Sequence, residues 1–199
     1  YILCQGNHGI GYIAAEHRYS QMPDYIYPER NSAFAATLVA TAPNHEGIHT
    51  MESAAYEFHD KAWGDLLVIA FEFAPRDETL EWARQLIESE AYGSRIEKEG
   101  YKLSPRNWPQ AVWDKLIYPS KNICLVLCGH TGAPPKFDAA GTADYRSTSA
   151  LRVDKAADGR DIPQMMFNSQ NGDGDWNGNG GDCWLRILEF KPDGKTISV

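Results

Sequence analysis

The apolar positions of this chain fall into short continuous runs and helical stripes, separated by long polar stretches. Residues 65–73 (DLLVIAFEF) are almost continuously aliphatic or aromatic, which predicts a strand covered on both faces. Apolar residues then recur at helical spacing from Leu80 to Ile87, so we expect an amphipathic helix over residues 78–89. Asp77 is a suitable N-cap for this helix. Together these residues predict a strand, a turn and a helix.

The second half of the chain predicts a helix and then a strand, and after these it becomes strand-like. A second helix is predicted over residues 109–118, where Pro109 suits the first turn. Residues 122–128 (NICLVLC) predict another buried strand. The last third predicts antiparallel sheet, and the turn Pro192-Asp193-Gly194 joins its final two strands. These three strands are expected at residues 164–167, 184–190 and 195–199.

The N-terminal part is less regular. Residues 1–5 (YILCQ) form a short apolar run that reads as part of a strand, and residues 10–64 show little periodicity. We expect long loops there, with a helical patch at 32–39 and a strand at 54–58. Three cysteines lie inside apolar runs without the C-x-x-C spacing of zinc or redox sites, which predicts buried free thiols at Cys4, Cys124 and Cys128.

Composition narrows the range of partners. The chain of 199 residues is 43% hydrophobic, which is typical of one globular domain. Its formal net charge of −8 leaves no basic stripe for a nucleic-acid backbone, so we expect no nucleic-acid partner. No apolar run reaches the roughly 20 residues of a membrane span. A small phosphorylated substrate stays compatible with this charge, because metals can supply positive charge locally. The oligomeric state and the compartment are left open, with a secreted or periplasmic location considered.

Two hydrophobic runs end in glycine followed closely by histidine. The first run leads into Gly6-Asn7-His8, and the second leads into Gly129-His130. In open α/β sheets, ligands bind beyond the carboxyl ends of the strands, and glycine lets the chain turn sharply there. Imidazole nitrogen and amide oxygen are suitable metal ligands. The pattern favours a shared polar crevice, in which residues 66–72 and 123–128 are neighbouring strands of one sheet and His8 and His130 lie at the same end. The alternative is a pair of ordinary surface histidines.

These residues resemble the calcineurin-like metallophosphoesterases. Gly6-Asn7-His8 is similar to the family's Gly-Asn-His-Asp motif, and Gly129-His130 is similar to its late Gly-His motif. Residues 68–83 (VIAFEFAPRDETLEWA), 122–132, 164–170 and 180–199 resemble a bacterial branch of the family. The resemblance implies an α/β (α+β) fold of two packed mixed β-sheets flanked by helices, the four-layer sandwich of that family. Residues 1–199 would form the C-terminal portion of this single domain.

The resemblance also implies an activity and a site. The protein would hydrolyse a phosphomonoester or phosphodiester with a metal-bound hydroxide, using two divalent metal ions (Mn, Zn or Fe). Asn7 and His130 would ligate the same metal. His8 would be catalytic, lying near the scissile bond and stabilising or protonating the leaving oxygen.

The sequence departs from the family pattern at several points. Gly9 replaces the Asp of the first motif, and Gly132 stands where the late motif has a second His. The early Asp-x-His and Gly-Asp motifs are not present, and no strand ending in a ligand His follows the first predicted helix, because Glu90 runs directly into Ala91. Either the chain is an inactive relative, or stretches are omitted before Tyr1 and around residues 90–91. We expect omission, because losing an internal strand would expose sheet edges and leave a hole in the core.

A binding protein is the rival interpretation. Residues 171–182 are rich in Gly, Asn and Asp, and Asp173-x-Asp175-x-Asn177-Gly178 matches the first half of an EF-hand calcium loop. The twelfth position is Trp184 in place of the expected Glu, which favours a turn-rich loop. The alternative function is therefore a catalytically degenerate or calcium-loop-bearing protein that recognises glycans or other surface ligands.

Overall fold

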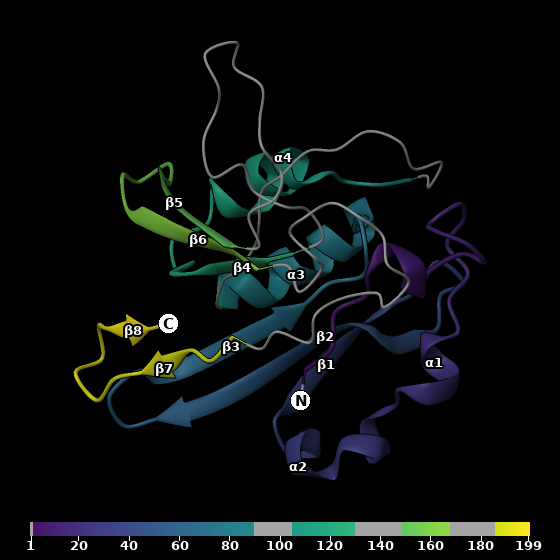
Figure 1. The fold of residues 1–199 in the computed structure, drawn as a ribbon, viewed down its shortest axis with the longest axis horizontal. Coiled ribbons are helices and arrows are strands. Elements are labelled where there is room, and N and C mark those ends of the chain that lie inside the picture. Colours follow the sequence, from purple (N-terminus) through teal and green to yellow (C-terminus); the bar gives the residue numbers. More distant parts are fainter. Residues whose placement is uncertain (1, 90–104, 130–148, 168–185) are drawn as a thin grey trace.

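The computed structural model describes residues 2–89, 105–129, 149–167 and 186–199. It shows a mixed α/β protein with several small sheets and few helices, which confirms the predicted class at that level (Figure 1). Three of the helical segments are single turns of four residues, and one helix is long. The helices are α1 (Met22–Tyr25), α2 (Ser32–Ala35), α3 (Asp77–Ser89) and α4 (Pro109–Val112), with 3-10 turns η1 (Asn7–Gly9) and η2 (Pro28–Asn31) and a π-turn, η3 (Trp113–Ile117).

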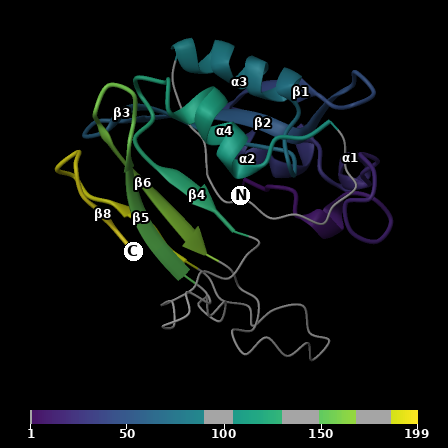
Figure 2. The ribbon, with the colours of Figure 1, turned by 90° about the horizontal axis from the view of Figure 1, so that it is seen from above.

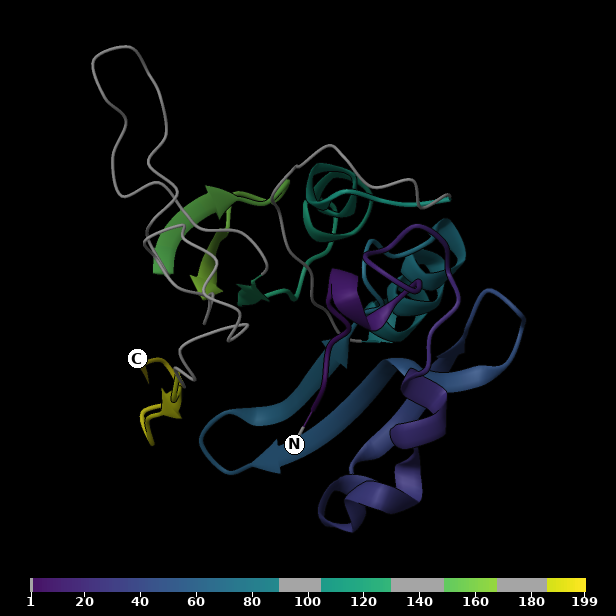
Figure 3. The same ribbon diagram turned by 45° about the vertical axis from the view of Figure 1, so that its right-hand side comes forward.

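The strands form two three-stranded sheets and one hairpin. The first sheet is antiparallel in the order β1-β2-β3, and the second has the order β4-β6-β5, in which β4 is parallel and β5 antiparallel to β6. Figures 1 and 3 show the two sheets as separate units. The strands are β1 (Leu38–Pro43), β2 (His49–Asp60), β3 (Gly64–Ala70), β4 (Val126–Cys128), β5 (Ser149–Lys155), β6 (Asp161–Phe167), β7 (Glu189–Phe190) and β8 (Ile197–Ser198).

The main core joins α3 and the α4–η3 segment to both sheets. The apolar face of α3 packs against η3 and against the second sheet, and Ile69 and Phe71 bring the end of β3 to the same cluster. Figure 2 shows α3 and α4 close together with the strands of the second sheet beside them. The members are Leu80, Ala83, Ile87, Val112, Trp113, Leu116, Ile117, Ile123, Val126, Ala156 and Ile162.

The opposite face of the first sheet carries a second cluster. Tyr56 and neighbouring residues of β2 pack against Met22 and Ile26 at α1, and against Ile2 of the N-terminal segment. This segment runs alongside the first sheet towards η1 (Figure 3). The first sheet is therefore covered on both sides, and η1 is held near the end of β3.

The C-terminal hairpin is confirmed, but within the described residues its strands are limited to β7 and β8, which are shorter than the predicted 184–190 and 195–199. The hairpin docks on the first sheet. β7 and β8 pair antiparallel around the predicted turn. The indole Nε1 of Trp63 donates a hydrogen bond of 2.7 Å to the carbonyl oxygen of Lys191, and its ring lies 5.0 Å from that of Phe190. β7 consequently lies beside the turn between β2 and β3 (Figure 1).

Several predicted elements are confirmed. The helix at 78–89 is α3, the helix at 109–118 is α4 with η3, and the strands at 54–58 and 164–167 lie within β2 and β6. The helical patch expected at 32–39 is limited to Ser32–Ala35. No helix in the described ranges combines the length and the apolar character of a membrane span.

Three strand predictions are wrong in detail. Residues 2–5 form no strand, and the strand expected at 122–128 is limited to β4. β3 is not buried on both faces: the face with Ile69 packs towards α3, whereas Val68 on the other face is 37% exposed. The continuous apolar run predicted burial on both faces, but β3 is an edge strand whose second face is only partly covered.

The predicted pairing of the two apolar runs is also wrong. Residues 66–72 and 123–128 were expected as neighbouring strands of one sheet, but β3 pairs with β2 and β4 pairs with β6. In the described part of the chain they lie in different sheets.

The expected burial of the thiols is not observed. Cys4 and Cys124 are exposed and Cys128 is half-buried. Around Cys124 the chain is extended and alternates, so Ile123 and Leu125 face the core and the thiol faces outward.

Candidate functional site

The predicted site residues Asn7 and His8 lie on a tight turn. The turn η1 is closed by a hydrogen bond of 3.0 Å from the N–H of Gly9 to the carbonyl oxygen of Gly6. Asn7 is buried, with 8% of its surface exposed. His8 is exposed on the same turn. Adjacent side chains thus face different surroundings.

One nitrogen of the His8 ring is held by the backbone. Nδ1 of His8 lies 3.0 Å from the carbonyl oxygen of Ile13. Because a carbonyl oxygen only accepts, Nδ1 carries the hydrogen of this bond. In the neutral ring, Nε2 then carries the lone pair and is available to bind a ligand or to exchange a proton.

The loop that follows His8 is organised by one carboxylate. The Glu16 side chain accepts hydrogen bonds from the backbone N–H groups of Tyr12, Ile13 and Ala14, at 2.6 to 2.9 Å. Hydrogen bonds from backbone N–H groups, first its own and then those of the loop, lower the pKa of Glu16 to about 2. The carboxylate therefore keeps the backbone of Ile13 in place beneath the His8 ring.

Gly11 is required at the centre of this loop. Its φ of +76° lies in the left-handed region, and a Cβ there would lie 2.3 Å from Oε2 of Glu16. A side chain at this position would collide with the group that organises the loop.

A small buried cluster anchors the loop to the segment after β3. Ile10, Ala15 and Ala74 pack together, with Phe73 and Trp108 against them. Ala15 and Ala74 have φ of +53° and +48°, a conformation that costs a non-glycine residue roughly 1–2 kcal/mol. Their burial in one cluster offsets this strain.

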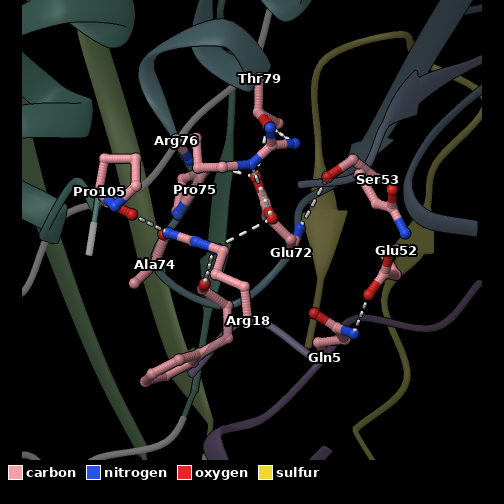
Figure 4. Close-up of polar contacts among 12 residues, drawn as sticks. Gln5, Arg18, Glu52, Ser53, Glu72, Ala74, Pro75, Arg76, Thr79 and Pro105 are labelled. Carbon is pink, nitrogen blue, oxygen red and sulfur yellow. Dashed lines mark hydrogen bonds and ion pairs between the residues drawn. The ribbon is translucent and has the colours of Figure 1, made fainter. Parts of the chain in front are cut away.

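Beside this cluster lies a buried ion-pair network (Figure 4). Glu72 accepts hydrogen bonds from Nη1 of Arg18 at 3.0 Å and from Nε of Arg76 at 3.1 Å, and the Glu72 side chain is 5% exposed. Arg18 also donates to the carbonyl oxygens of Ala74, at 2.7 Å, and Pro105. Burial lowers the pKa of the Arg18 guanidinium, and the Glu72 carboxylate opposes this shift. The network joins the N-terminal loop to the turn between β3 and α3.

The same region is tied to β2 by side-chain hydrogen bonds. The hydroxyl of Ser53 accepts the backbone N–H of Glu72 at 2.9 Å, and the Gln5 amide donates to Glu52 at 3.1 Å and to Ser20 at 2.8 Å (Figure 4). These contacts position the chain immediately before Gly6.

A depression of about 450 Å³ opens beside the turn. His8 lines it together with residues of the N-terminal loop, including Tyr12, and with Met22, Tyr25 and Ile26 at α1. Of the described residues that line it, none is Asp, Glu, Lys or Arg. Its size is within the usual range for small-molecule sites.

Other predicted site residues cannot be placed. His130, the junction of Glu90 and Ala91, and the loop 171–182 lie outside the described residues. The expected proximity of His8 and His130 therefore stays a prediction. In the described ranges, no three His, Cys, Asp or Glu side chains lie together as a metal site would require.

Sequence reasoning missed the Arg18–Glu72 pair, whose partners are 54 residues apart. The available signal was Glu72 itself, an acidic residue inside an apolar run. Such a position in a strand-like run needs a buried partner, but the local pattern does not say which one.

The turn combines a largely buried Asn7 with an oriented imidazole, and of these two side chains His8 lines the depression. Comparison with known proteins adds no assignment. No protein-family model, curated protein or solved structure matches this chain.

Proposed function

We propose that this protein is a metal-dependent hydrolase of phosphomonoesters or phosphodiesters. The observation that carries the proposal is the turn after Gly6. It holds Asn7, a largely buried residue, directly before the oriented His8 ring, and this ring lines a depression. An amide oxygen is a suitable ligand for a divalent cation. The resemblance of the Gly-Asn-His and Gly-His motifs to metallophosphoesterases supports the same site.

Of the two proposed donors only Asn7 lies in the described residues, and its amide oxygen is a chemical type that binds divalent metals. Asn7 would hold the metal through its amide oxygen, and His130 would hold it through an imidazole nitrogen, in a site for two ions of Mn, Zn or Fe. When bound, such ions lower the pKa of water and neutralise charge on a phosphoryl group. The role of His130 rests on the resemblance.

His8 would serve the leaving oxygen of the ester. The Ile13 carbonyl fixes the ring through Nδ1, so Nε2 is the atom that would hold and deliver a proton. Because His8 lines the depression, a proton held there can reach the leaving oxygen of an ester bound at its edge.

We also propose the finer architecture. The two sheets would be parts of a four-layer sandwich of packed mixed sheets flanked by helices. The cluster that joins α3, η3 and both sheets in one core supports a single domain.

The test is hydrolysis of 4-nitrophenyl phosphate by the purified protein in the presence of Mn²⁺, Zn²⁺ or Fe²⁺, with metal content measured in parallel. Asn7→Ala and His130→Ala should each weaken metal binding. The loss of affinity should exceed roughly 10–100-fold, which is typical when a residue that hydrogen-bonds to a metal ligand is replaced. His8→Ala should keep its metal and lose about 10²–10⁴-fold in turnover, the range for a general acid.

The matched control is His45→Ala, which removes an exposed histidine far along the chain from the turn. It should change neither metal content nor turnover. Loss of metal in His8→Ala would show that the roles are wrongly assigned. Full metal content without hydrolysis of any phosphate ester would reject the enzyme and favour a binding protein.

A further inference from the structure

The described residues that line the depression beside His8 include no Asp, Glu, Lys or Arg. They combine Tyr12 and Tyr25 with apolar side chains such as Met22 and Ile26, the amides of Gln5 and Gln21, and backbone around three glycines. A phosphoryl group would gain nothing from such walls, whereas a neutral apolar group would be well accommodated. The depression is therefore suited to the organic part of a ligand.

One wall is an aromatic ring held at an exposed position. The backbone N–H of Tyr12 is bound to Glu16, and the Tyr12 ring lies 4.7 Å from the His17 ring and 5.8 Å from the Tyr19 ring. Tyr12 is nevertheless 78% exposed. Its neighbours restrict the ring but leave most of its surface open, so little conformational entropy is lost when a ligand packs on it.

Another part of the lining comes from the segment around α1. Tyr25 is 60% exposed and lines the depression with Met22 and Ile26. Met22 and Ile26 also pack on the β2 cluster, which anchors this wall to the first sheet. Two tyrosines from separate, anchored segments thus contribute to one uncharged depression.

We propose that this depression binds the planar, uncharged aromatic group of a phosphate ester, so that the substrate class is aryl esters in preference to alkyl or sugar phosphates. The inference rests on the proposed function, because His8 at the edge of the depression is the group assigned to the leaving oxygen. Two aromatic rings that pack edge-to-face or offset gain binding free energy beyond the contribution of buried area. A saturated group of equal size lacks this additional contribution.

The test measures binding of 2-naphthol, a neutral planar probe without a phosphate, by NMR titration of the metal-free protein. The ligand control is decahydro-2-naphthol, which has the same ring skeleton but no aromatic face. We expect 2-naphthol to bind several-fold more tightly. Tyr12→Ala and Tyr25→Ala should each weaken it about 5- to 10-fold, and Tyr12→Phe should retain it.

The protein control is Tyr27→Ala, which removes an exposed tyrosine near α1 that does not line the depression. Thermal unfolding of each variant checks that it is folded. Equal binding of the two probes, or unchanged binding in both folded alanine variants, would overturn the proposal.

A turnover comparison separates this proposal from the proposed function. With metal present, 2-naphthyl phosphate should have a higher kcat/KM than ethyl phosphate, and Tyr12→Ala should reduce that preference. If both esters are cleaved without preference, the aromatic site is wrong and the phosphoesterase stands. If 2-naphthol binds as expected but no ester is cleaved, the enzyme proposal fails, and the assignment of a substrate class fails with it.

Discussion

Replacing Glu72 with alanine should be among the most damaging single changes in this chain. Its carboxylate faces two guanidinium groups, those of Arg18 and Arg76, whose side chains are 5% and 10% exposed. The substitution leaves both cations buried without their counter-ion and removes an acceptor for the Thr79 hydroxyl. Because an uncompensated buried charge is far more costly than a missing contact, the effect should exceed that of an ordinary cavity.

The loss in free energy of unfolding follows from the two buried guanidinium groups that remain after the substitution. Removing one partner of a buried ion pair typically costs about 3–5 kcal/mol, and the free energy of unfolding of a domain is about 5–15 kcal/mol in total. With a urea m-value of about 2 kcal/mol/M, the loss corresponds to a midpoint about 2 M lower. Arg18→Ala should be similarly damaging, since it also strips the carbonyl oxygens of Ala74 and Pro105 of a donor.

The assay is urea unfolding followed by circular dichroism on the two single variants and the double variant. Because the residues share one network, the double variant should lose clearly less than the sum of the single losses. Glu81→Ala is the matched control: Glu81 pairs with Arg84 on the exposed side of α3, and its loss should not shift the midpoint measurably. A Glu72→Ala loss below about 1 kcal/mol, or strict additivity, would refute the reasoning.

Three further predictions test the loop and the core. The pKa of Glu16 is depressed from 4.5 to about 2, so its contribution to stability is present above pH 4.5 and is lost as the pH falls towards 2. Glu16→Gln should therefore flatten the pH dependence of thermal unfolding across this range. Gly11→Ala should lower the free energy of unfolding by about 1–2 kcal/mol or more, through its φ of +76° and its collision with Glu16. Gly47→Ala, at φ +81° in open space, should cost less, and an equal cost at both positions would show that the collision is relieved. Ile117→Ala, in the centre of the core, should lower the free energy of unfolding in urea by about 2–5 kcal/mol. Ile48→Ala, on the surface, should change it by no more than about 0.5 kcal/mol, and equal losses would contradict the assigned core.

The elements predicted best are those whose signal is local. α3 was predicted because its apolar residues recur at helical spacing, and the C-terminal hairpin was predicted because Pro192-Asp193-Gly194 is a strong local turn signal. Pro109 likewise marked the start of α4 correctly. In each case the physical cause lies within a few residues of the element.

The strands were predicted less well, because a strand is stabilised by partners that lie elsewhere in the chain. β5 was not predicted from its sequence, and it forms by pairing along its whole length with β6. The two apolar runs that looked like neighbours belong to different sheets, since apolar content reports burial and not the identity of the partner strand.

The candidate site also has features that depend on local sequence and features that depend on long-range packing. By itself, the sequence determined that Gly6-Asn7-His8 would form a sharp polar turn with possible ligand atoms, because glycine and the polar side chains specify that locally. Only the tertiary structure decided that Asn7 is buried while His8 is exposed, and that His8 is oriented by the Ile13 carbonyl. It also decided that Arg18 finds Glu72 across 54 residues, because burial and charge pairing depend on which segments the packed core brings together.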